Sequence, residues 1–325
     1  MINISSIRRI TQKYGIILIL ILMCIVFAIM SSAFLSVSNI LNILNQTAIF
    51  GIMALGMTFV IISKGIDLSV GSVLALSGLV AASLAQIPAQ MKMYQNMPEI
   101  HIIFPILAAL LIGTICGIIN GSLVAFTRIP AFIATLGMLT IVRGYALIYS
   151  NARPLSNFTP QMNAIGGRFF GIPVPIIIYL FMFVVSYVLL NKTRFGKNTF
   201  AIGGNITAAE VSGVNVQKYL VMIYAYCGLL AGIAAIVFAG RVGSVHPGAA
   251  DGYELTAIAA TTIGGTSHSG GVGTIGGALV GALVLSVMRN GMTLLGFSPY
   301  SQKILEGVII IGAVIVDMRK NAKRG

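Results

Sequence analysis

The chain has 325 residues, of which 57% are hydrophobic and only 8% are charged, and its mean hydropathy is +0.98. A soluble domain carries about 25% charged residues, so this composition excludes a water-soluble enzyme and a disordered chain. The formal net charge is +13 at pH 7, yet lysine and arginine stand singly between long apolar stretches. This scattering excludes a nucleic-acid-binding patch and is typical of a polytopic membrane protein.

The apolar stretches predict an all-α membrane protein with about ten transmembrane helices, since a bilayer core takes about 20 apolar residues per helix. The first stretch has no charge and is long enough to span, which favours a membrane helix over a signal peptide. The second and third are separated only by residues 64–67, and the eighth is short. The predicted spans are residues 15–35, 46–63, 68–86, 101–126, 130–149, 172–191, 218–240, 254–267, 273–296 and 300–317.

The basic residues predict the orientation of these spans, because lysine and arginine collect on the cytoplasmic side of a membrane. Both ends of the chain are basic, so an even number of spans with both termini in the cytoplasm is expected. Basic residues then lie mainly inside, at Arg8, Arg9, Lys13, Lys64, Arg128, Lys192, Arg194, Lys197, Lys218, Arg319, Lys320, Lys323 and Arg324. Fewer lie outside, at Lys92, Arg153, Arg168, Arg241 and Lys303. Arg143 and Arg289 fall near the outer ends of spans, where their side chains are expected to reach the membrane surface.

Glycine is abundant within the predicted spans. Gly113, Gly117 and Gly121 follow one another at intervals of four residues, as do Gly277 and Gly281. In lipid, this small-xxx-small spacing lets two helix backbones approach closely. The glycines therefore predict tight packing between membrane helices.

Two short segments read alike and predict an internal repeat. Residues 65–69 and 252–256 both run glycine, bulky apolar residue, acidic residue, leucine, hydroxyl residue, and each opens an apolar span. In the expected topology they start on opposite sides of the membrane. The chain would then consist of two inverted halves of five spans each, a common plan among transporters.

Asp67 and Glu254 are the acidic members of this repeat, and two roles are open to them. In the first turn of a helix, a carboxylate accepts hydrogen bonds from unpaired N–H groups and meets the positive end of the helix dipole. Alternatively, Asp67, Ser69, Glu254 and Thr256 line the permeation route or a gate. Lys64 stands three residues before Asp67 and is near enough to pair with it.

The sequence contains no G-x-x-x-x-G-K-[ST] motif, so it predicts no phosphate-binding loop and no ATP motor in this chain. No cluster of histidine, cysteine and carboxylate residues suggests catalysis or a metal site, and a transport role without enzymatic activity is expected. Among the acidic residues away from helix starts, only Glu306 falls well inside a span. Ion-coupled transporters usually carry buried ionisable relays, so a secondary transporter is disfavoured but stays open.

The longest predicted cytoplasmic loop, residues 191–217, contains a short helix. Asn205 is a good N-cap, residues 206–211 can wind through about two turns, and Gly213 can adopt the left-handed conformation that ends a helix. Such a helix either packs under the membrane bundle or docks into a cytoplasmic partner.

Five stretches of the chain resemble the permease subunits of ribose-type ABC sugar importers, a group related to branched-chain amino-acid permeases. They are GIDLSVGSVLALSG (65–78), RIPAFIATLGMLTIVRGYALIY (128–149), TRFGKNTFAIGGNITAAEVSGVNV (193–216), GYELTAIAATTIGGTSHSGGVGTIGGALVGALVL (252–285) and RNGMTLLG (289–296). Together they span most of the chain, in the family's order. Three residues depart from the family pattern, which usually has glycine at Lys64, aspartate at Thr256 and an apolar residue at His268.

The resemblance implies a single transmembrane permease domain over residues 1–325, in the cytoplasmic (inner) membrane of a bacterium. It implies that loop 191–217 carries a coupling helix, which seats in a cleft of an ATP-hydrolysing subunit. The matching positions are Asn205, Ala208, Ala209, Glu210 and Gly213.

The same resemblance implies the partners and the cargo. The partners are an ATPase subunit that binds ATP and Mg, a periplasmic or surface sugar-binding protein and a second permease subunit, most simply an identical one. The chain itself holds no cofactor, and the pathway for a ribose-like pentose or a hexose runs along the dimer. A branched-chain amino-acid permease is the alternative, and a membrane scaffold is disfavoured because the chain has no large soluble domain.

Overall fold

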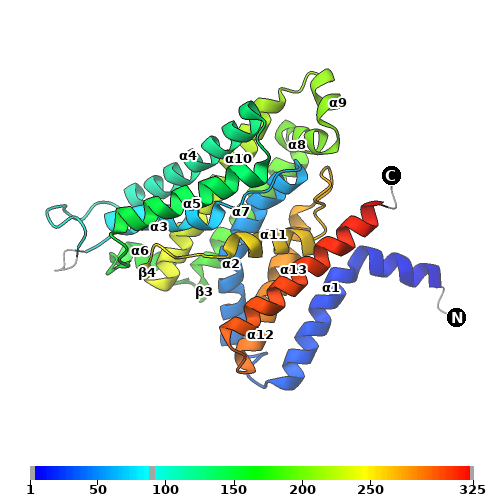
Figure 1. Cartoon of the computed structure of the whole chain (residues 1–325). Coiled ribbons are helices and arrows are strands. Elements are labelled where there is room, and N and C mark those ends of the chain that lie inside the picture. Colours follow the sequence, from blue (N-terminus) through cyan, green and yellow to red (C-terminus); the bar gives the residue numbers. More distant parts are fainter. Residues whose placement is uncertain (1–3, 88–91, 323–325) are drawn as a thin grey trace.

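The computed structural model describes residues 4–87 and 92–322 and is mainly helical (Figure 1). Lys323 and Arg324 lie outside the described residues, as do the side chains of Arg8, Arg9, Lys13, Arg319 and Lys320. The helices are α1 (Ile4–Met30), α2 (Val37–Ile62), α3 (Val70–Leu84), α4 (Ile103–Thr127), α5 (Ala131–Ser150), α6 (Pro160–Ile165), α7 (Val174–Lys192), α8 (Arg194–Gly204), α9 (Ile206–Val211), α10 (Val216–Val242), α11 (Tyr253–Ile263), α12 (Ile275–Leu294) and α13 (Pro299–Ala322).

Six of the described helices are long and apolar enough to cross a membrane: α2, α4, α5, α7, α10 and α12. The prediction of a polytopic helical membrane protein is thereby confirmed. Each predicted span overlaps one helix, although the boundaries differ by several residues. Two helices that overlap predicted spans are short: α3 has 15 residues and α11 has 11. At 1.5 Å per residue they measure about 22 and 16 Å, less than the roughly 30 Å of a bilayer core.

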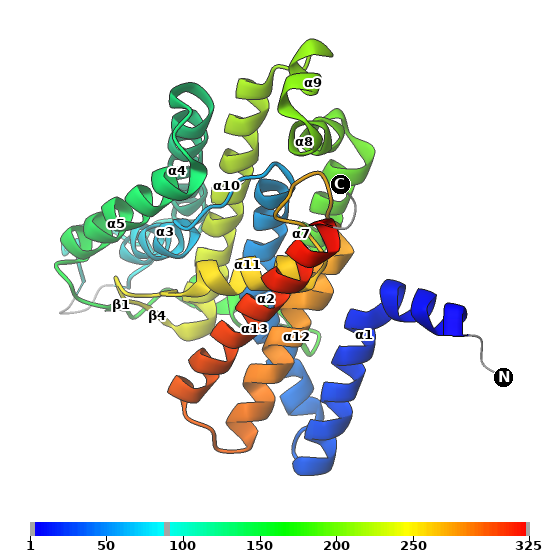
Figure 2. The same ribbon diagram turned by 45° about the vertical axis from the view of Figure 1, so that its right-hand side comes forward.

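Helix α2 lies at the centre of the bundle (Figures 1 and 2). In its apolar stretch 89% of the residues are buried, against 28% in α5 and in α7. It packs against α7, α10, α11 and α12. A helix that is apolar all round and buried all round forms the core, and the helices that keep exposed apolar faces surround it.

The helices pack in two similar sets. In the first set, α3, α4 and α5 all contact one another. In the second set, α11, α12 and α13 do the same. The two long helices exchange partners, because α10 packs on α3 and α4 whereas α2 packs on α11 and α12. The set α3, α4 and α5 thus packs in the same way as the set α11, α12 and α13, whereas α1 packs on α12 and α7 packs on α2.

Within the described residues, the connections between the long helices contain four strands of two residues each. β1 (Leu155–Ser156) pairs antiparallel with β4 (Ser244–Val245), which ties the segment after α5 to the segment after α10. β2 (Arg168–Phe169) pairs with β3 (Ile172–Pro173) in a tight hairpin before α7. These pairs fix the loops that lead to α11 and α7.

Glycines bring α4 and α10 together, as the small-xxx-small spacing predicts. A Cβ atom on Gly117 would lie 2.2 Å from the carbonyl oxygen of Tyr224, and one on Gly113 would lie 2.3 Å from that of Gly228. A methyl group cannot fit at either distance, so the two backbones are in direct contact.

We expect Gly117→Ala to lower the free energy of unfolding by about 1–3 kcal/mol, because the new methyl group overpacks the contact between α4 and α10. Thermal unfolding of the purified protein in mild detergent measures the change. Gly137→Ala on α5 is the matched control, since a Cβ there has no neighbour within 4 Å. Equal stability of the two variants would contradict this packing.

Candidate functional site

Helices α8 and α9 project together from one end of the bundle (Figures 1 and 2). The Asn205 side-chain oxygen Oδ1 accepts a hydrogen bond from the Ala208 backbone N–H at 3.0 Å. Gly213 follows the helix in the left-handed region, with φ of +83°. Both ends of the predicted short helix are confirmed, and each is held by the residue that the sequence indicates.

The exposed surface of α9 differs in part from the expected set. Ala209 is buried, with its side chain packed among Ile202 and Val216. Glu210 is exposed, and Val211 is 86% exposed at the end of the helix. Val211 was not among the residues that the sequence predicted for this surface.

Helix α8 was not predicted from the sequence. It is a second helix of the loop and comprises residues 194–204. Its N-cap is Thr193, whose hydroxyl accepts from the Gly196 N–H at 3.5 Å. Ile202 on this helix is fully buried against α9. The signal was present in the alternation of apolar and basic residues, but three glycines among 11 residues weaken a helix prediction.

Asp67 lies in a break between α2 and α3, three residues before the first residue of α3. It is 1% exposed, and its Oδ1 atom accepts from the Ser69 N–H at 2.9 Å and the Ser69 hydroxyl at 2.7 Å. Asn120 on α4 donates to both carboxylate oxygens, at 3.3 and 3.4 Å, and to the Ser69 hydroxyl at 2.8 Å. The carboxylate thus satisfies the backbone at the start of α3 and anchors it to α4.

The suggested pair of Lys64 with Asp67 is wrong. The Asp67 oxygens turn inward to Ser69 and Asn120, whereas Lys64 is exposed and its Nζ donates to the Gly204 carbonyl oxygen at 3.4 Å. The two side chains stand three positions apart in non-helical chain, so helical spacing does not bring them together.

Glu254 opens α11 and meets the start of α3. It is 7% exposed, and its Oε1 atom accepts from the Gly252 N–H at 3.2 Å. Its other oxygen, Oε2, lies against Gly71, because a Cβ on Gly71 would be 2.2 Å from it. The two similar segments, far apart in the sequence, therefore join at the starts of their helices.

Arg143 on α5 holds the loop that leads into α11. Its Nη1 donates to the carbonyl oxygens of Pro247 at 2.6 Å and Ala249 at 2.9 Å. The guanidinium is therefore half-buried against this loop.

Arg289 also turns inward, contrary to expectation. Its Nη2 lies 2.6 Å from Oε2 of Glu306 on α13 and donates to the Thr256 hydroxyl at 2.8 Å. Thr256 in turn donates to Glu306 Oε1 at 2.6 Å, and the guanidinium lies 4.5 Å from the centre of the Phe50 ring. A buried acid needs a counter-charge, so the lone Glu306 inside a span was the signal for this pair.

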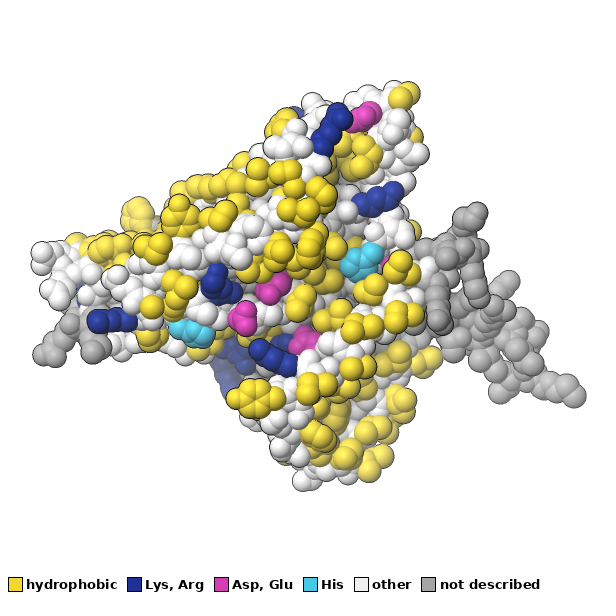
Figure 3. Space-filling model, in the orientation of Figure 1, with side chains coloured by type: hydrophobic (Ala, Val, Ile, Leu, Met, Phe, Trp, Pro, Cys, Tyr) yellow, Lys and Arg dark blue, Asp and Glu magenta, His cyan; other side chains and the backbone are white. Residues whose placement is uncertain are grey.

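Charged groups gather on one face at the depth of the helices. Figure 3 shows basic, acidic and histidine side chains across the middle of this face, among hydrophobic ones. Around the start of α11, His246 and Asp251 are exposed and Arg143 is half-buried. Charged side chains are costly in lipid, so this face suits a polar passage or another protein better than acyl chains.

His268 lies in the loop between α11 and α12. Its Nε2 atom is 2.8 Å from the Thr262 hydroxyl, and its backbone N–H donates to Asp317 at 3.1 Å. Burial lowers the pKa of His268, against the opposing effect of the Asp317 carboxylate. The ring is therefore neutral at pH 7, and its hydrogen bond joins the loop to α11.

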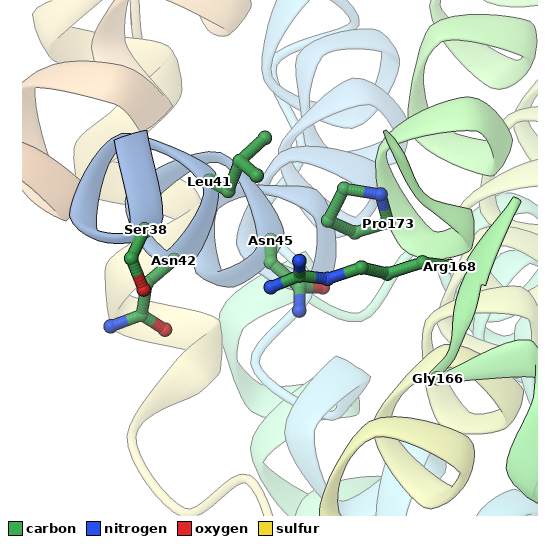
Figure 4. A pocket seen from close by; sticks show the side chains of 7 residues that line it. All are labelled: Ser38, Leu41, Asn42, Asn45, Gly166, Arg168 and Pro173. Carbon is green, nitrogen blue, oxygen red and sulfur yellow. The ribbon is translucent and has the colours of Figure 1, made fainter. Parts of the chain in front are cut away.

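A polar pocket of about 240 Å³ lies at the end of α2 opposite to α8 and α9 (Figure 4). The Arg168 side chain extends toward Asn45 across the pocket. Its lining comprises Ser38, Leu41, Asn42, Asn45, Gly166, Arg168 and Pro173. With a guanidinium, two amides and a hydroxyl and no acid, it suits a carboxylate from another molecule.

A family model described as the permease component of a branched-chain amino-acid transport system matches residues 39–314. The chain belongs to this permease family. The match includes the breaks before α3 and α11 and the α8–α9 loop. The resemblance drawn from the sequence motifs is thereby confirmed.

Curated relatives match almost the whole chain. The ribose import permease protein RbsC of Escherichia coli K12 is 43% identical over 314 residues, covering 95% of this chain and 94% of the relative. RbsC of Bacillus subtilis 168 is 42% identical over 96% of this chain and 94% of its own. The galactose/methyl galactoside import permease protein MglC of Escherichia coli K12 is 38% identical over 99% of both chains. No solved structure matches the chain.

We expect Arg289→Met to destabilise the protein by about 3 kcal/mol, because Glu306 would stay buried without its partner. Arg289→Met combined with Glu306→Gln should recover most of the loss. Thermal unfolding of four proteins in detergent, the unmodified chain, each single variant and the double variant, gives the double-mutant cycle. Additive losses from the two substitutions would contradict the pairing.

Proposed function

We propose that this chain is the membrane-spanning permease of an ATP-driven ABC importer for a monosaccharide, a ribose-like pentose or a hexose. The observation that carries the proposal is similarity along nearly the full length to permeases named for ribose and galactose import. The chain supplies the pathway and no ATPase domain. In this reading, ATP and Mg are bound by a separate subunit.

The α8–α9 unit is the part of the chain suited to receive that subunit. It stands out from the bundle, its short helix is capped at both ends, and it presents Val211 and Glu210 outward. We assign Asn205 and Gly213 to holding the helix, Ala209 to seating it on α8, and Ala208 and Glu210 to the contact. Val211 is added as the apolar centre of the contact, because it is the most exposed apolar side chain of α9.

Ten spans in two inverted halves agree with the packing. Helices α3, α4 and α5 contact one another in the same way as α11, α12 and α13. The long helix α10 packs on α3 and α4, and α2 packs on α11 and α12. The two short helices, α3 and α11, occupy equivalent positions and meet at their starts. With ten spans, both termini and the α8–α9 unit lie in the cytoplasm of the bacterium, beneath its inner membrane.

The sugar would pass along the face on which charged side chains gather around the start of α11, among them Arg143 and Asp251. A second copy of the chain covering this face would keep those groups away from lipid and leave a polar passage between the copies. Asp67, Ser69, Glu254 and Thr256 are all buried, with hydrogen bonds to backbone or to neighbouring side chains. We therefore assign them to positioning the helix starts that form the gate, rather than to holding the sugar.

The sugar-binding protein would dock at the opposite end from α9. The pocket of Arg168 and Asn45 lies there, beside the hairpin of β2 and β3. The connections 150–171 and 241–253 form this end of the molecule and are joined by the pairing of β1 with β4. An acidic side chain on the binding protein fits the pocket by charge.

A branched-chain amino acid is the second candidate for the cargo, because the family model carries that description. Competition separates the two: ribose or galactose, but not leucine, should reduce uptake of labelled sugar by cells that depend on this transporter. Competition by leucine alone would favour the amino-acid cargo.

We expect Val211→Asp to weaken the binding of the ATPase subunit by about ten-fold or more, because a charge replaces the apolar centre of the contact. Co-purification of the ATPase with the tagged permease measures this. Phe170→Asp is the matched control, since Phe170 is 90% exposed in the hairpin at the other end. Full retention of the ATPase by Val211→Asp would overturn the role of α9.

A further inference from the structure

Three segments that are distant in the sequence meet backbone to backbone beside α9. They are residues 62–64, 203–204 and 270–273, and we name them the glycine junction. The Gly271 N–H donates to the Ile62 carbonyl oxygen at 2.8 Å. A Cβ on Gly203 would lie 1.7 Å from that same oxygen and 2.6 Å from the Gly271 nitrogen.

Each segment of the junction continues into a part of the site. Residues 62–64 lead through the break to Asp67 and α3, and residues 203–204 lead to the Asn205 cap of α9. Residues 270–273 lie between α11 and α12, and the next residue, Thr274, is the N-cap of α12. The junction is thus where the α8–α9 unit touches the break before α3 and the loop between α11 and α12.

Lys64 closes the junction from outside. Its backbone is left-handed, with φ of +64°, a conformation that glycine adopts more readily. Its side chain crosses Gly270, where a Cβ would be 2.3 Å from Lys64 Cγ, and its Nζ donates to the Gly204 carbonyl oxygen at 3.4 Å. The lysine therefore bridges the last residue of α8 and the loop before α12.

The same loop is tied to α11 and α13. The Asp317 oxygen Oδ2 accepts from the His268 N–H at 3.1 Å and from the Ser267 hydroxyl at 3.2 Å. His268 also contacts the Thr262 hydroxyl on α11. Hydrogen bonds therefore connect this loop directly to α11 and to α13.

We infer that the glycine junction transmits movement of α9 to the broken helices α3 and α11, with Gly203 as its positioning residue. The inference rests on the proposed function, because it takes α9 to be the helix that the ATPase moves. Backbone atoms in direct contact have no side chain between them to absorb a shift. A movement of α8 must displace residue 62 and residue 271 together.

Gly203→Ala and Gly204→Ala form a matched pair for the test. The first places a methyl group within the junction, whereas a Cβ on Gly204 has no neighbour within 4 Å. Each variant is purified with its ATPase subunit, reconstituted in liposomes and supplied with the sugar-binding protein. The readout is sugar transported per ATP hydrolysed, which simple loss of folded protein does not change.

We expect Gly203→Ala to keep its ATPase but to transport about three-fold less sugar per ATP, or lower still, while Gly204→Ala matches the unmodified complex. An unchanged ratio in Gly203→Ala would overturn the inference. Should Gly203→Ala not assemble, Gly273→Ala decides, because its new methyl group enters the junction but meets the Ile62 side chain, which can shift. A lower ratio in that variant supports the junction, and an unchanged ratio contradicts it.

The proposed function is tested separately in the same experiment. If the unmodified chain does not retain an ATPase, the role of α9 fails and the junction fails with it. If the ATPase binds through Val211 but both junction variants transport normally, only the inference about the junction is wrong.

Discussion

Backbone N–H groups at the start of a helix have no partner within the helix, and a bilayer interior offers no water to replace it. This chain places two such starts, those of α3 and α11, inside the bundle. Asp67 supplies acceptors for one and Glu254 for the other. The contacts around them follow from this need. Asn120 anchors the first carboxylate, and Gly71 leaves room for the second.

The remaining packing lets these two starts approach each other. The glycine contact between α4 and α10 draws together the helices that flank α3. On the other side, Arg289 and Glu306 join α12 to α13 over α11.

Much of this arrangement was predictable from periodicity and from local motifs. Span positions follow from apolar length, and the caps of α9 follow from Asn205 and Gly213, because these effects are local in sequence. Contacts across the bundle were not. The partners of Arg143, Arg289 and Lys64 are backbone or side-chain groups far along the chain. Charge-placement rules describe an isolated span and take no account of such neighbours. Helix α8 was missed because three glycines lower its helix propensity, and one of them, Gly203, serves a tertiary contact.

In the proposed function, this chain forms the sugar pathway and contacts the ATPase through α9, while a separate subunit hydrolyses ATP. The most direct measurement is uptake of labelled ribose and galactose by liposomes that contain the chain alone or with its ATPase and binding protein. We expect uptake only with the complete set of proteins and only with ATP. Uptake by the chain alone, driven by a proton or sodium gradient, would contradict the account and identify a secondary transporter.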